Sequence, residues 1–189
     1  MQSEYAKQFV TERISPNVFE LSDYINDAFF VPYDEMERFN HVLVNPAKGM
    51  KFTQKIMYAM PDVTFIPLQG LSRTRLINLM RQSKLYIDFG DHPGKDRMPR
   101  EAAMCGCCVI TSRNGSAAYS EDVGLPDYYK IERGEANISK IADRIREVLR
   151  LYPVDDFAEY REQIKGEKAR FQDGVRELAE RLRREGNDC

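Results

Sequence analysis

The chain has 189 residues, of which 42% are hydrophobic and 31% charged, and its formal net charge is -2. This length accommodates one large domain, or a domain with an appended arm, and the near-neutral charge argues against a nucleic-acid-binding protein. No apolar run approaches the ~20 residues that span a bilayer, and the N-terminus lacks the apolar segment of a signal peptide, so we predict a cytoplasmic protein without a transmembrane segment.

Residues 1–40 predict a helix followed by a connector. Gln2–Val10 has the pattern of a short amphipathic helix. The polar run that follows contains Pro16 and Pro32 and carries no strong periodicity. This part of the chain therefore leads into a domain that begins near residue 41.

Residues 41–153 alternate between predicted strands and predicted helices. The strands are short runs rich in aromatic and β-branched residues, at 41–44, 63–66, 85–89, 108–111 and 128–131. The helices are predicted at 50–60, after Ser72, at 98–105 and at 137–151. Alternation of this kind predicts an α/β fold with a Rossmann-like parallel sheet flanked by helices. In such folds ligands bind at the carboxyl ends of the strands.

Residues 154–189 predict a C-terminal amphipathic helical arm. Large apolar residues recur there at three- and four-residue steps: Phe157, Tyr160, Ile164, Phe171, Val175, Leu178 and Leu182. This stripe indicates one long helix, or a helix pair broken near Gly166. Its apolar face requires a cover, either from the domain itself or from another chain, as in a homodimer.

Polar residues gather in the loops and helix starts that follow the predicted strands. They are Asn45, Lys48 and Gly49 after the first strand, Asp91, His92, Lys95, Arg97, Arg100 and Glu101 after the third, and Gly115 and Ser116 after the fourth. Glycine turns and helix N-termini can hold phosphate groups through backbone N–H groups. The Lys48-Gly49 turn is neither a Walker loop nor a GxGxxG fingerprint. Taken singly, each charged residue is equally explained as a surface charge, and their joint placement is what indicates a site.

The cysteines indicate a reducing compartment rather than a disulfide framework or a metal centre. Cys105, Cys107 and Cys108 surround a predicted helix end and buried strand, and Cys189 is terminal. No metal site is predicted, because zinc would require four ligands at finger-like spacing and no second Cys/His pair is present. A catalytic thiol would have only His41 or His92 as a partner, so buried core thiols are the favoured interpretation.

Three of these segments together resemble the C-terminal, donor-binding domain of GT-B glycosyltransferases. They are the Lys48-Gly49 turn, the run 100–104 with Gly106, Val109 and Ile110, and the turn 114–116. The run GKDRMPREAAMCGCCVIT is more narrowly similar to bacterial glycosyltransferase-like proteins from surface-polysaccharide loci. The resemblance covers roughly residues 2–151, and residues 2–30 resemble the end of the N-terminal, acceptor-binding domain.

The resemblance implies a nucleotide-sugar donor, with a UDP-sugar as the default, and no tightly bound cofactor. Lys48 would contact the donor pyrophosphate and Glu101 the ribose hydroxyls. Gly115 and Ser116 would approach the nucleotide. The resemblance identifies no catalytic residue, and Asp91 and His92 are the candidates.

Two positions depart from the family pattern. Leu43 stands where retaining members usually have an arginine, and Pro93 stands where they often have a glutamate. The chain also encodes only one of the two domains that close over the substrates in a GT-B enzyme. We therefore expect the donor-binding half of a glycosyltransferase of polysaccharide or glycan synthesis, working with an acceptor domain. The alternative is a non-catalytic Rossmann-type nucleotide-binding or assembly module.

Overall fold

A four-stranded parallel sheet forms the centre of the computed structural model, which describes residues 1–30, 37–153 and 155–187. The strands lie in the order β2-β1-β3-β4 and are β1 (Phe39–Val44), β2 (Thr64–Pro67), β3 (Ser83–Asp88) and β4 (Cys108–Thr111). The helices are α1 (Glu4–Arg13), α2 (Met50–Ala59), α3 (Arg73–Gln82), α4 (Arg97–Met104), α5 (Ile138–Leu151), α6 (Ala158–Lys165) and α7 (Glu167–Asn187). Short 3-10 helices join them, η1 (Asp27–Phe29), η2 (Gly115–Ala118), η3 (Asp127–Tyr129), η4 (Glu135–Asn137) and η5 (Asp155–Phe157).

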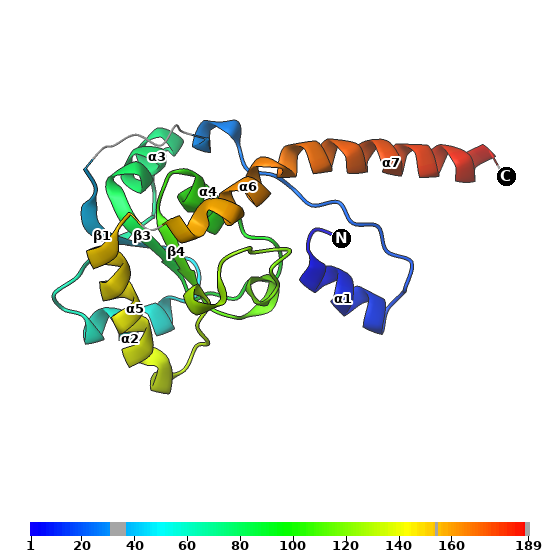
Figure 1. Ribbon diagram of the computed structural model, residues 1–189. Coiled ribbons are helices and arrows are strands. Elements are labelled where there is room, and N and C mark those ends of the chain that lie inside the picture. The colour runs from blue at the N-terminus through cyan, green and yellow to red at the C-terminus, as the bar shows by residue number, and fades with distance from the viewer. Residues whose placement is uncertain (31–36, 154, 188–189) are drawn as a thin grey trace.

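Helices cover both sides of the sheet. In Figure 1, α2 and α5 pack together below the sheet, and α3, α4 and α6 lie above it. The residues of β3 and β4 are buried almost without a break, as expected for parallel strands covered on both faces. The predicted α/β class, with a Rossmann-like parallel sheet flanked by helices, is therefore confirmed.

The chain reverses its direction across the sheet beside β1. It leaves β1 through α2 to reach β2, and it returns through α3 to β3 on the other side of β1. Val44 pairs with Ile87, so the carboxyl ends of β1 and β3 lie next to each other. The helices that follow these two strands, α2 and α4, lie on opposite faces of the sheet. This switch point between β1 and β3 is where open α/β sheets bind ligands.

The fifth predicted strand, 128–131, is wrong in its secondary structure. The structure has the 3-10 helix η3 there and a single parallel bridge between Thr111 and Lys130. Tyr129 is buried, packs against Phe157 with ring centroids 4.7 Å apart, and donates a hydrogen bond to Asp156. Packing of this ring favours a 3-10 helical turn over an extended strand. The sequence alone does not distinguish the two, because the same apolar residues fit either one.

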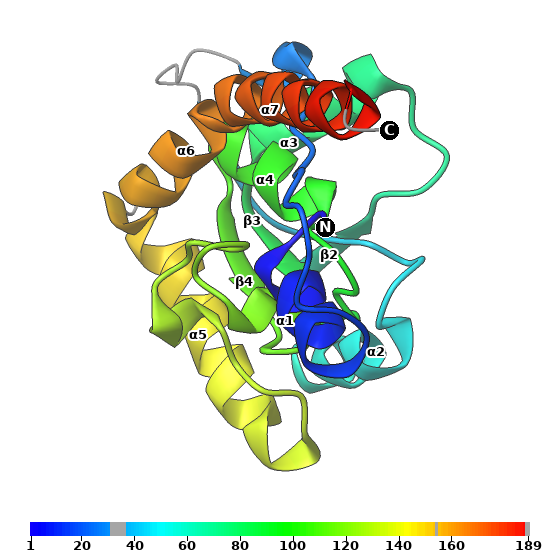
Figure 2. The same ribbon diagram turned by 90° about the vertical axis from the view of Figure 1, so that its right-hand side faces the viewer.

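The C-terminal arm is the predicted helix pair, broken at Gly166. Helix α7 extends beyond the body of the domain in Figure 1, and Figure 2 shows it foreshortened, running towards the viewer. The first half of its apolar stripe is covered by the chain's own N-terminal segment, because Phe171 packs against Tyr24 with ring centroids 5.2 Å apart. Val175 and Leu182 are exposed. Cover by the domain itself is thus confirmed for the first half of α7, and the homodimer stays a prediction for the second half.

No helix within the described parts of the chain combines the length and apolar character needed to cross a membrane.

A buried ionic cluster joins α4 to α7 and to the N-terminal segment. The Arg100 guanidinium is fully buried, and it contacts Glu167 and Asp23 at 2.8 Å each. It also donates hydrogen bonds to the backbone carbonyls of Lys95 and Asp96. The other Glu167 oxygen lies 2.8 Å from the Lys95 ammonium. Glu167 is the first residue of α7, so this helix is fixed directly to the loop before α4.

We expect Arg100→Met to lower the free energy of unfolding by about 3–5 kcal/mol, because it leaves a buried carboxylate without its main partner. Urea denaturation measures this change. Arg176→Met is the matched control, since Arg176 pairs with Asp173 on the exposed surface of α7 and its loss should change stability by less than about 0.5 kcal/mol. Equal effects of the two substitutions would contradict a structural role for the cluster.

Candidate functional site

The turn after β1 packs directly on the segment after β3. Gly49 has a φ of 62°, and a Cβ at this position would lie 2.4 Å from the carbonyl oxygen of Phe89. A Cβ on Gly90 would lie 2.7 Å from the Cβ of Lys48. Both glycines are therefore required by the close approach of the two loops. Asn45 shapes the same turn by accepting a hydrogen bond from the N–H of Ala47.

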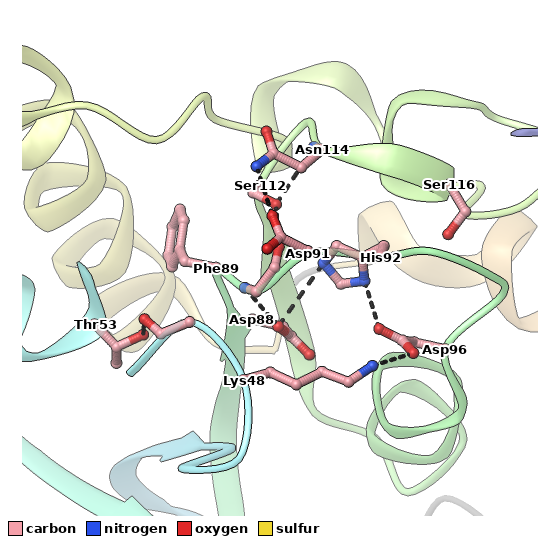
Figure 3. Close-up of polar contacts among 12 residues, drawn as sticks. Lys48, Thr53, Asp88, Phe89, Asp91, His92, Asp96, Ser112, Asn114 and Ser116 are labelled. Carbon is pink, nitrogen blue, oxygen red and sulfur yellow. Dashed lines mark hydrogen bonds and ion pairs between the residues drawn. The ribbon is translucent and has the colours of Figure 1, made fainter. Parts of the chain in front are cut away.

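Lys48 points along this edge towards the loop before α4. Its ammonium contacts the Asp96 carboxylate and remains partly exposed (Figure 3). Burial opposes ionisation of Asp96, but the neighbouring His92 and Lys48 outweigh this effect and lower its pKa. Lys48 is thus a partly exposed cation whose partner in the protein is an anion at the same edge.

His92 lies at the centre of this edge. Its side chain is fully buried, with Nδ1 2.8 Å from Asp96 Oδ2 and Nε2 3.8 Å from Asp88 Oδ1 (Figure 3). Asp88 ends β3 and is itself buried. The structure therefore brings together three potential metal ligands, a cluster that the sequence analysis did not predict.

Asp91 points to the opposite, solvent side of the loop. Its side chain is 80% exposed and contacts Arg133. Hydrogen bonds from Asn114 and Arg133 lower its pKa, so it is a carboxylate at neutral pH. Arg133 was not among the predicted site residues, because it follows the last predicted strand in a segment without a recognisable motif.

Gly115 and Ser116 support the loop that carries His92. Gly115 has a φ of 58°, and a Cβ there would lie 2.0 Å from the His92 carbonyl oxygen. The N–H of Ser116 donates to the same carbonyl at 2.8 Å, and its buried hydroxyl donates to the Gly94 carbonyl. The space that Gly115 leaves is therefore taken by the protein backbone.

Glu101 and Arg97 lie on α4, near the start of α3. Burial raises the pKa of Glu101, although the positive charges of Arg97, Arg100 and Arg73 oppose this rise. Among the residues that the structure describes, none forms a hydrogen bond with its carboxylate. Arg97 is exposed. Arg73, at the start of α3, was not predicted as part of the site.

Lys95 and Arg100 do not face this edge. Both are buried and bind Glu167 in the ionic cluster described above. The structure therefore brings together Lys48, Asp88, His92 and Asp96 at the switch point, and it places Lys95 and Arg100 behind them as supports.

No protein-family model matches the sequence, and no curated protein matches it either. Solved structures do match. S. aureus TarM, in a structure of a mutant with Fondaparinux, alpha-GlcNAc-glycerol and UDP, gives a TM-score of 0.69 at 15% identity, over 95% of this chain and 42% of TarM. A glycosyltransferase from Rickettsia africae gives 0.61 at 14% identity, over 94% of this chain and 60% of that protein. The chain therefore shares its fold with part of these solved proteins, as the resemblance to a GT-B fold predicted.

A second TarM structure matches in the same way, with a TM-score of 0.63 at 13% identity, over 92% of this chain and 42% of that one. The chain thus spans only 42% to 60% of the length of these solved proteins.

Three of the cysteines are core residues of the domain. Cys105, Cys107 and Cys108 are buried, as predicted. Burial raises the pKa of Cys105 to about 12 and also raises the pKa of Cys107. The Cys107 thiol donates to the Met80 carbonyl at 3.0 Å. These are properties of inert thiols, because only the thiolate is a nucleophile.

We expect Cys105 and Cys107 to react with a disulfide-exchange reagent only as fast as the domain opens. The measurement is labelling followed by mass spectrometry in a Cys189→Ser background, since Cys189 lies outside the described residues. Labelling of the same protein unfolded in concentrated urea gives the reference rate. Equal rates in the folded and unfolded protein would revive the catalytic thiol.

Proposed function

We propose that the chain is the nucleotide-sugar-binding half of a glycosyltransferase of polysaccharide or glycan synthesis. The observation that carries this proposal is the placement of Lys48 at the switch point, partly exposed and directed at the start of α4. UDP is present in one structure of TarM, which shares the fold, and this supports a UDP-sugar as the donor.

Lys48 would bind the donor diphosphate and stabilise it as it leaves. An ammonium that contacts a phosphate oxygen gains a charge-assisted hydrogen bond, and this interaction strengthens as negative charge develops on the leaving group. Asp96 holds the ammonium at this edge until a phosphate takes its place. Of the two candidate catalytic residues, only Asp91 is exposed enough to reach a sugar, because the His92 side chain is enclosed.

Glu101 would accept hydrogen bonds from the ribose hydroxyls. Its carboxylate is half-buried, and no described residue occupies it with a hydrogen bond. Arg73 and Arg97 supply positive charge that favours its ionised form. A partly buried acceptor without a protein partner is well suited to bind two adjacent hydroxyl groups.

Transfer would require a second domain for the acceptor, since the chain spans 42% to 60% of the length of the glycosyltransferases that it resembles.

The alternative function is that of a non-catalytic nucleotide-binding module. Leu43 favours this alternative, because it is fully buried in β1 and supplies no cation at the edge. Sugar turnover measured with and without a separately supplied acceptor domain distinguishes the two.

Lys48→Met should weaken UDP binding by about tenfold to a hundredfold, which corresponds to the loss of one charge-assisted hydrogen bond of about 1.5–3 kcal/mol. Isothermal titration calorimetry at fixed salt measures the change. Lys51→Met, on the exposed side of α2, is the control and should leave the affinity unchanged. If wild-type protein shows no UDP binding at millimolar concentration, the proposal is wrong.

Glu101→Gln should remove the preference for ribose hydroxyls. Wild-type protein is expected to bind UDP more tightly than 2′,3′-dideoxy-UDP by about tenfold, whereas the variant should bind both alike. Competition against a fluorescent UDP analogue gives the two affinities. A variant that keeps the full wild-type preference would place the ribose elsewhere.

A further inference from the structure

Three side chains that can ligate a metal converge behind Lys48. Asp88 comes from the end of β3, His92 from the following loop and Asp96 from the residue before α4. Their ligand atoms all lie within 4.8 Å of one another. Figure 3 shows the imidazole between the two carboxylates, with Lys48 beside Asp96.

Asp88 is held in one orientation by groups that do not compete for its charge. It accepts hydrogen bonds from the Tyr86 hydroxyl at 2.8 Å and from the Gly90 N–H at 2.9 Å. Outer-shell donors of this kind orient the carboxylates that bind metals in proteins.

His92 is buried without a hydrogen bond to either ring nitrogen. Its Nδ1 lies 2.8 Å from Asp96, yet this contact does not meet hydrogen-bond geometry. Its main chain is fixed, since its carbonyl accepts the N–H of Ser116. A buried imidazole whose two nitrogens make no hydrogen bond costs free energy unless something else binds it.

Asp96 occupies the N-cap position of α4 but does not cap the helix. An aspartate there normally accepts a hydrogen bond from a backbone N–H of the first turn, and Asp96 makes no such bond. Its Oδ2, next to His92, has no hydrogen-bond partner. The carboxylate is thus directed into the cluster instead of at its own helix.

We propose that Asp88, His92 and Asp96 bind one divalent transition-metal ion of the Mn²⁺ or Zn²⁺ type. Two carboxylates balance its charge, and an imidazole ligand favours these ions over Mg²⁺ and Ca²⁺, which take oxygen ligands. Ligand atoms bonded at about 2.1 Å to one ion are at most about 4.2 Å apart, so ion binding would draw together any pair near the 4.8 Å limit.

The ion would reach the cluster from the edge of the sheet. The Asp96 side chain is 18% exposed and the Lys48 side chain 34% exposed, whereas Asp88 and His92 are enclosed. The Lys48 ammonium contacts Asp96 and therefore competes with a metal for the same carboxylate. Removing this ammonium should strengthen metal binding, whereas it should weaken the binding of a diphosphate.

The test uses the full chain, stripped with EDTA and free of nucleotide, so that its result does not depend on donor binding. Co²⁺ is titrated while visible ligand-field absorption is recorded, and Mn²⁺, Zn²⁺ and Mg²⁺ are titrated by calorimetry. We expect one ion per chain, with Mg²⁺ the weakest. Asp96→Asn and His92→Gln should each weaken binding by at least about tenfold to a hundredfold, the loss caused by removing even an outer-shell partner. Lys48→Met should tighten it by at least about threefold, through loss of a competing cation.

His41→Gln is the matched control, because His41 is the only other histidine and lies in the first half of β1, away from this edge. Its Co²⁺ spectrum and affinity should equal those of wild-type protein. Absence of a bound ion, or an affinity that Asp96→Asn and His92→Gln leave unchanged, would overturn the proposal. Lys48→Met keeps all three ligands, so unaltered or weaker binding in this variant also counts against it.

Discussion

The fold depends on the burial of one guanidinium group. Removing a charge from water costs several kcal/mol, so Arg100 is stable only if partners surround it. Those partners are Asp23 and Glu167, which lie 77 and 67 residues away along the chain, and two backbone carbonyls of the loop before α4. The N-terminal segment, the C-terminal helix and the loop at the candidate site are therefore parts of one packed unit.

The same loop is held from both sides by turns that contain glycine. The turn after β1 contacts it through Gly49 and the turn after β4 contacts it through Gly115, in each case with no room for a side chain. Three loops from three adjacent strands thus form one layer over the carboxyl edge of the sheet. The positions of His92 and Asp96 are set by this layer before any ligand binds, which reduces the conformational entropy that binding would cost.

The sequence was sufficient to predict the four strands of the sheet and the helices that flank it. In these segments the apolar runs and the turn residues indicate the same element boundaries. The sequence failed at 128–131, where burial of Tyr129 against Phe157 decides the backbone. It also assigned Lys95 and Arg100 to ligand binding, since their carboxylate partners are remote in sequence. The cluster of Asp88, His92 and Asp96 could not be predicted because its four-residue spacing in a loop matches no zinc-finger pattern, and only the folded loop brings its ligands together.

Helix α7 is anchored at its base by Glu167 and extends away from the domain. The helix has 21 residues and a length of about 31 Å at 1.5 Å per residue, so a small rigid-body rotation at its base becomes a displacement of several ångströms at its tip. The same carboxylate that anchors the helix also binds Lys95 and Arg100. A displacement at the base of α7 would therefore alter the contacts that hold the loop of His92 and Asp96.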